Sequence, residues 1–136
     1  PDYCAASVAG RLAPTGVDEF AALTLEYPGG RTALLTCGSD RVGTLEATVQ
    51  GQRARITLPS FFQATELLLQ VPDQPVEIRQ YEKIDGFAYE LEEFRRLLAE
   101  GRIESPTVPH RDTVAALRLI EWASAELQHR HKAGSN

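Results

Sequence analysis

The chain has 136 residues, 43% of them hydrophobic, which suffices for one domain with a core but not for two ordinary domains. Its 14 basic and 19 acidic residues give a net charge of −5, and the basic ones are scattered, so we expect no nucleic-acid partner. No apolar run approaches the ~20 residues of a membrane span and no signal peptide is present, so we expect no membrane contact and a cytoplasmic location.

The N-terminal part of the chain predicts three β-strands. Residues 3–12 are expected to form a strand built largely from small residues. Residues 19–27 and 31–37 are runs in which apolar and polar side chains alternate, the pattern of a strand with one buried face. The segment Pro28-Gly29-Gly30 between the second and third runs predicts a tight turn, so these two strands form a hairpin.

A second hairpin is predicted within residues 42–58. Its two arms alternate with a period of two around Gln50-Gly51, which predicts a two-residue turn. That turn places Glu46 opposite Arg55 and Thr48 opposite Arg53. One face of the hairpin is then apolar and the other carries a matched charge pair.

Two further runs, at residues 65–71 and 76–81, complete a series of strands with short connections, which favours antiparallel pairing. The period then changes to three and four, which predicts a helix near residues 87–98 that ends at Gly101 and a second helix at 110–128. This order predicts an α+β fold, with an open, largely antiparallel sheet and both helices on one face.

Each helix carries an apolar stripe that we expect to be buried on the sheet. The stripe of the first helix consists of Phe87, Leu91, Phe94, Leu97 and Leu98. Truncation of Leu117 to alanine should then cost on the order of 2–5 kcal/mol of the free energy of unfolding. The stripe of the second helix consists of Val114, Leu117, Ile120, Ala123 and Leu127.

One layer of helices leaves the other sheet face uncovered. Its Thr, Glu and Arg side chains, with Phe20 and Leu34 among them, fit either a solvated surface or a partner-binding surface. The second interpretation predicts a homodimer or tetramer in which Glu and Arg rows of two copies meet. The candidate interface residues of the hairpin are Glu46, Thr48, Arg53 and Arg55.

The residues alone give no complete catalytic set. The three histidines lie near helix ends without a second ligand at metal spacing, so no metal site is expected. Cys4 and Cys37 fall in strand-like runs, where buried reduced thiols are expected more than a disulfide. The sequence also lacks the GxGxxG and GxxxxGK[ST] motifs, so no catalytic or cofactor-binding residue is assigned.

Aromatic residues occur at the ends of two strands. Phe61 and Phe62 come directly after the second hairpin, and Tyr81 precedes a polar turn. Such side chains either close the edge of a core or line the mouth of an apolar ligand site. Both interpretations stay open for Phe62 and Tyr81.

Motifs along nearly the whole chain, in matching order and spacing, resemble the C-terminal domain of the Gfo/Idh/MocA oxidoreductases. The trans-dihydrodiol and xylose dehydrogenase branch of that family is the most similar. The motifs are Thr15-Gly16-Val17-Asp18, Tyr27-Pro28-Gly29-Gly30, the hairpin 43–58, Phe61-Phe62-Gln63-Ala64-Thr65-Glu66-Leu67, Gly86-Phe87-Ala88-Tyr89-Glu90, and Glu104-Ser105-Pro106 with Pro109 and the final helix.

The resemblance implies that residues 1–131 form a substrate and oligomerisation domain and that 132–136 are a frayed tail. It also implies that an N-terminal Rossmann domain, which carries the NAD(P) fingerprint and the catalytic lysine, is missing. Phe62 and Tyr81 match positions that contribute to the family's substrate pocket, and Arg11 resembles an arginine of the dimer interface. Lys83 lacks the proline of the family's Glu-Lys-Pro motif and is not given the catalytic role.

The chain starts at Pro1 and contains no methionine, so we expect a piece of a longer protein. The resemblance implies that the parent is an NAD(P)-dependent dehydrogenase acting on a small sugar-like or dihydrodiol alcohol. The piece alone is expected to bind no NAD or NADP and to catalyse no turnover of the alcohol. The alternative is a non-catalytic binding or assembly module with an oligomerising sheet.

Overall fold

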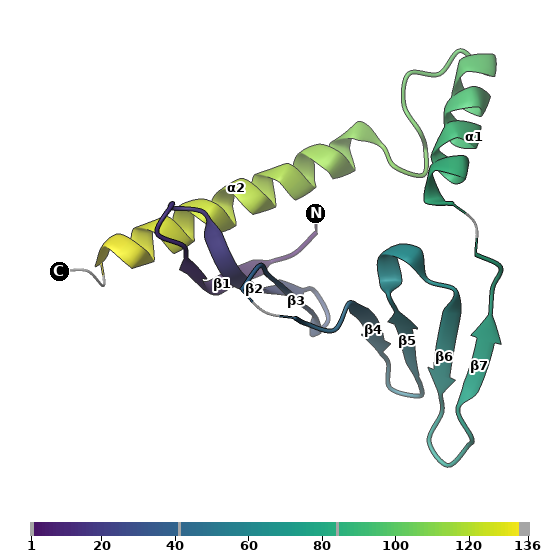
Figure 1. Ribbon diagram of the computed structural model, residues 1–136, viewed down its shortest axis with the longest axis horizontal. Coiled ribbons are helices and arrows are strands. Elements are labelled where there is room, and N and C mark those ends of the chain that lie inside the picture. Colours follow the sequence, from purple (N-terminus) through teal and green to yellow (C-terminus); the bar gives the residue numbers. More distant parts are fainter. Residues whose placement is uncertain (1, 41, 84, 134–136) are drawn as a thin grey trace. The chain divides into compact units, whose positions relative to one another are not determined.

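The computed structural model describes residues 2–40, 42–83 and 85–133, which form seven strands and two α-helices (Figure 1). Lys132 and Ala133, expected in a frayed tail, extend the last helix, and residues 134–136 of that tail lie outside the described residues. The elements are β1 (Ala5–Leu12), β2 (Asp18–Tyr27), β3 (Arg31–Gly38), β4 (Glu46–Gln50), β5 (Arg55–Pro59), the 3-10 turn η1 (Phe61–Gln63), β6 (Glu66–Gln70), β7 (Glu77–Gln80), α1 (Gly86–Ala99) and α2 (His110–Ala133).

Every strand pair in the described residues is antiparallel and the sheets are open, which confirms the predicted α+β class. The strands form two sheets, β1-β2-β3 and β4-β5-β6-β7, where the sequence predicted one. Turn-favouring residues such as Ser39, Asp40 and Gly43 lie between β3 and β4, and the described residues there form no strand. The chain accordingly divides into two compact units, 1–42 with 104–136, and 43–103.

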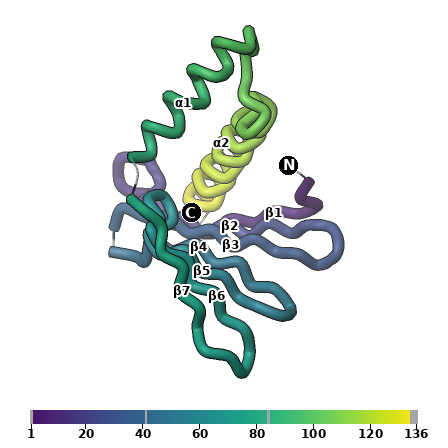
Figure 2. Tube along the Cα trace, turned by 90° about the vertical axis from the view of Figure 1, so that its right-hand side faces the viewer, coloured from purple at the N-terminus to yellow at the C-terminus, as the bar shows by residue number. Residues whose placement is uncertain are grey.

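The core of the first unit lies between α2 and the strands β1 and β2, which the two views show side by side (Figures 1 and 2). Val8 and Ala21 from the sheet pack with Ala123 and Leu127 from the helix, and all four are buried. Leu12 and Leu23 pack against this cluster. The cluster fixes which face of this sheet is covered, namely the one that carries Val8.

The α2 stripe predicted from the sequence is only partly buried. Val114, Leu117 and Ile120 have exposed fractions of 44%, 54% and 59%. Counted back from Ala123, successive residues of this stripe are three positions apart, which is less than the 3.6 residues of one helical turn. Each step of three therefore rotates the side chain further away from the packed face. The apolar side chains that are half-buried or buried recur every four residues: Ala115, Leu119, Ala123 and Leu127.

The hairpin of β4 and β5 has a different register from the predicted one. Paired positions sum to 105 rather than 101, because residues 51–54 form the connection and the Gly51 N–H bonds to the Ala54 carbonyl oxygen at 2.9 Å. Thr48 therefore lies opposite Thr57, and Gln50 lies opposite Arg55. The shift is even, so each residue that remains in β4 or β5 keeps its predicted face.

Helix α1 begins and ends where the sequence predicts. The Asp85 carboxylate accepts a hydrogen bond from the Phe87 N–H at 3.1 Å, which caps the first turn. Gly101, with φ +63°, closes the other end, where the N–H of Arg102 bonds to the Leu97 carbonyl oxygen at 2.9 Å. The predicted apolar stripe of this helix is largely exposed rather than buried: Phe87, Leu91, Phe94 and Leu98 are exposed, and Leu97 is half-buried.

The two cysteines are free thiols, as expected, but both are exposed rather than buried. Cys37 lies in β3, an edge strand of the first sheet, whereas α2 covers β1 and β2. The Cys4 thiol donates to the Glu26 carbonyl oxygen at 3.3 Å. Among the described helices, none is long and apolar enough to cross a lipid bilayer.

Candidate functional site

A pocket of about 750 Å³ lies in the second unit where three segments converge. The first segment runs from η1 to the start of β6, the second follows β7, and the third opens α1. Phe62 and Tyr81, singled out from the sequence, both line this pocket. Its volume lies in the range of pockets that hold small ligands.

Backbone contacts hold the first two segments in place. Ser60 adopts a left-handed conformation with φ 49° and turns the chain out of β5, and its carbonyl oxygen accepts the Gln63 N–H at 2.7 Å. The Tyr81 N–H donates to the Thr65 carbonyl oxygen at 2.7 Å, which continues the β6–β7 pairing up to the pocket. The Phe62 and Tyr81 side chains therefore project from anchored backbone.

The aromatic side chains of the pocket are accessible. Phe62, Tyr81 and Tyr89 have exposed fractions of 58%, 53% and 62%. Phe61 contacts Phe62 in an edge-to-face arrangement, with ring centroids 6.0 Å apart and planes at 86°. Sequence reasoning did not assign Tyr89 to the site; its place in the Gly86-Phe87-Ala88-Tyr89-Glu90 motif was the available signal.

The charged groups of the pocket are Glu82, Lys83 and Asp85. Asp85 is engaged in the cap of α1, and Lys83 forms no ion pair with any residue in the described part of the chain. Beside the pocket, a 2.8 Å hydrogen bond from Arg79 to Glu77 raises the pKa of the Arg79 guanidinium. The lining thus combines aromatic rings with a few polar groups, an arrangement suited to binding and orienting a small organic molecule.

The candidate interface residues fall on both sheets. Arg11 lies on the face of the first sheet opposite α2, with ion pairs of 2.7 Å to both Glu19 and Asp40. The Asp40 side chain is 10% exposed, so this arginine is held within its own sheet.

On the second sheet, Glu46, Thr48 and Arg55 share one face, as predicted. Glu46 and Arg55 form an ion pair at 3.7 Å although they do not lie opposite each other. The expectation that Arg53 pairs with Thr48 is wrong, because Arg53 lies in the connection between β4 and β5, where the longer turn takes it out of the ladder. Across the ranges 2–40, 42–83 and 85–133, no group of three or more His, Cys, Asp or Glu could hold a metal ion.

No protein-family model matches the sequence. The trans-1,2-dihydrobenzene-1,2-diol dehydrogenase of Mus musculus is 29% identical over 123 residues, which are 86% of this chain and 37% of the relative. Relatives of the same name from Danio rerio and Sus scrofa are 30% and 32% identical over 83% and 85% of this chain, and 36% and 37% of their own length. The chain therefore spans little more than a third of these relatives.

Two solved structures of UDP-N-acetylglucosamine 3-dehydrogenase GnnA from Acidithiobacillus ferrooxidans share the fold, with TM-scores of 0.75 and 0.76. In each case 93% of this chain and 42% of GnnA are covered at 19% identity. The predicted relationship is thereby confirmed: this chain is related to the Gfo/Idh/MocA oxidoreductases, in their trans-dihydrodiol dehydrogenase branch, and corresponds to their C-terminal part.

Proposed function

We propose that this chain is the C-terminal domain of an NAD(P)-dependent oxidoreductase that acts on a small sugar-like or dihydrodiol alcohol, and that it supplies part of the substrate pocket. The observation that carries the proposal is that Phe62 and Tyr81, far apart in sequence, line one pocket. Because the similar proteins are dehydrogenases, the parent protein is proposed to be an oxidoreductase as well. Aromatic side chains suit the apolar ring faces of such alcohols, and the polar lining suits their hydroxyl groups.

The dinucleotide does not fit the residues of this chain. The sequence has no GxGxxG segment at which a pyrophosphate could lie against a helix N-terminus. We therefore assign NAD or NADP, which would supply the hydride acceptor or donor, to a Rossmann domain elsewhere in the parent. The role of this chain is to bind and orient the alcohol.

The test uses the full-length protein that contains this chain. We expect oxidation of trans-dihydrodiols or small sugars that requires NAD or NADP. Phe62→Leu and Tyr81→Leu should raise KM for the alcohol by about two- to tenfold and leave KM for the dinucleotide unchanged. The control is Phe94→Leu, which removes an exposed ring outside the pocket. Absence of dinucleotide-dependent turnover on all such alcohols would contradict the proposal and favour a binding or assembly module.

We also propose that the face with Glu46, Thr48 and Arg55 joins copies of the chain into a dimer or tetramer. The face is flat and exposed, carries both charge signs, and includes the 57% exposed side chain of Ile78. A two-fold axis through it would bring the glutamates of one copy near the arginines of the other. A stable interface of this kind needs roughly 1,000 Å² of total buried area. Arg11, on the open face of the first sheet, is proposed as a further contact.

A further inference from the structure

Tyr89 provides a third aromatic wall of the pocket that contains Phe62 and Tyr81. It follows the first turn of α1, its side chain is 62% exposed, and it lines the pocket. Within the described residues its ring makes no stacking contact with another aromatic side chain. The capping bond from the Phe87 N–H to Asp85 fixes the backbone of the turn from which Tyr89 projects. The exposed ring itself is then available to contact a ligand.

Gly86 leaves room in the same wall. A Cβ built on this glycine would meet no atom within 4 Å, and the residue lines the pocket. The wall formed by the start of α1 therefore combines an open space with one projecting aromatic ring. A compact ring compound, whose C–H bonds can pack against the aromatic face, fits this combination better than a long chain does.

The charged groups that line the pocket also restrict the charge that a ligand can carry. Glu82 and Asp85 contribute carboxylates and Lys83 contributes one ammonium group, whereas none of the arginines in the described part of the chain lines the pocket. A single lysine can bind phosphate as a point charge, but here two carboxylates outnumber the one ammonium group, and the resulting net negative charge disfavours a phosphate. The Lys83 ammonium and the Thr65 hydroxyl suit neutral oxygen atoms at the edge of a ring.

We propose that Tyr89 stacks on the face of an uncharged cyclic alcohol, with Lys83 and Thr65 bonding its hydroxyl groups, and that Tyr89 thereby determines specificity for such rings. The inference rests on the proposed function for the identity of the pocket. It adds a specificity-determining residue on α1 and excludes phosphorylated ligands from this part of the site.

The test measures binding without cofactor or turnover. Ligand-observed NMR of the 136-residue chain with trans-cyclohexane-1,2-diol should show saturation transfer, and an equal concentration of cyclohexyl phosphate should show less. Tyr89→Leu should reduce the transfer from the diol by about two- to tenfold, whereas Tyr89→Phe, which keeps the ring, should retain it. Phe94→Leu, a ring removed from the same helix outside the pocket, should match the wild type.

Gly86→Leu is a second variant that fills the space on the same wall and should also abolish transfer. Far-ultraviolet circular dichroism checks that each variant is folded. No transfer to the wild type, transfer unaffected by both Tyr89→Leu and Gly86→Leu, or stronger transfer to the phosphate would overturn the inference. Lack of dinucleotide-dependent turnover in the full-length protein would instead overturn the proposed function and leave the binding result standing.

Discussion

Gly10 of β1 lies directly against Leu127 of α2. A Cβ built on Gly10 would lie 3.1 Å from the Cδ2 atom of Leu127 and would overlap the Phe20 carbonyl oxygen. Leu127 is 5% exposed and belongs to the buried cluster of the first unit. The absence of a side chain at Gly10 therefore lets β1 lie close both to the neighbouring strand β2 and to α2.

Substitution of Gly10 by alanine should destabilise the protein by about 1–3 kcal/mol, because the added methyl group forces the strand or the helix to move. Urea unfolding followed by circular dichroism measures the change. Gly43→Ala is the control, since a Cβ there meets no atom within 4 Å, and it should change the free energy of unfolding by less than about 1 kcal/mol. Equal effects of the two substitutions would contradict the close approach.

The two sides of α2 should respond differently to truncation. Leu127→Ala removes a buried side chain and should cost about 2–5 kcal/mol. Leu117→Ala, at a position that is 54% exposed, should cost less than about 1 kcal/mol, in place of the large effect that the sequence pattern predicts. The same unfolding measurement compares them; a larger loss for Leu117 would mean that another surface covers this side of α2 in solution.

Reversing the charge of Arg55 should weaken association more than folding. Arg55→Glu removes the ion pair with Glu46 and places like charges on the proposed interface, so the dissociation constant should rise by about tenfold or more. The change in the free energy of unfolding should stay below about 1 kcal/mol because the pair is exposed. Sedimentation velocity at micromolar concentration gives the measurement.

Arg79→Glu is the matched control, since Arg79 lies on the other face of the same sheet, opposite Leu67. It should leave the dissociation constant unchanged if the proposed face is the interface. If the wild-type 136-residue chain remains monomeric at these concentrations, the proposed association through this face is wrong for that chain.

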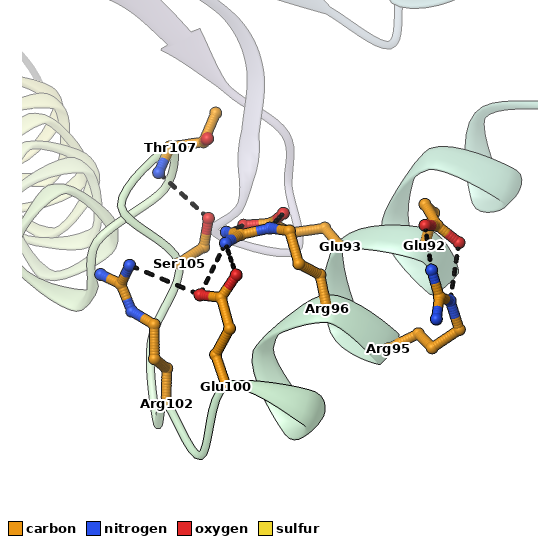
Figure 3. A network of polar contacts seen from close by, with 8 residues as sticks. All are labelled: Glu92, Glu93, Arg95, Arg96, Glu100, Arg102, Ser105 and Thr107. Carbon is orange, nitrogen blue, oxygen red and sulfur yellow. Dashed lines mark hydrogen bonds and ion pairs between the residues drawn. The ribbon is translucent and has the colours of Figure 1, made fainter.

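Ion pairs along α1 should make one carboxylate titrate at low pH. Arg95 donates hydrogen bonds of 3.0 and 2.6 Å to the two oxygens of Glu92, and these bonds lower the pKa of Glu92 (Figure 3). A lowered pKa in the folded state stabilises the fold above the ordinary glutamate pKa, and this stabilisation is lost as the pH falls through the lowered value. Carboxyl ¹³C NMR titration should show Glu92 titrating below an ordinary glutamate.

Arg95→Gln should return the Glu92 titration to the ordinary range, because the charged hydrogen bonds that shift it are gone. Arg96 offers a comparison one residue along: it bridges Glu93 at 2.8 Å and Glu100 at 2.6 Å (Figure 3), and the two glutamates raise the pKa of its guanidinium. Arg96→Gln should leave Glu92 shifted. A Glu92 pKa that does not respond to Arg95→Gln would refute the assigned cause.

The local pattern of the sequence was sufficient for most elements and their ends. Alternation with a period of two marks the strands, Gly29 and Gly30, with φ of +80° and +74°, make the turn between β2 and β3, and Gly101 ends α1. The faces of β4 and β5 also followed from alternation alone, because an even shift in register leaves every side chain on its side. These features depend on residues a few positions apart.

Other features depended on elements far apart in sequence. The sequence could not show that the strands divide into two sheets, nor that the side of α2 with Leu119 rather than Leu117 packs against β1 and β2. Both sides of that helix are apolar, so the position of the sheet decides which one is buried. The same holds for the pocket, because the fold of the second unit, rather than any local pattern, brings Tyr89 to the pocket that Phe62 and Tyr81 line.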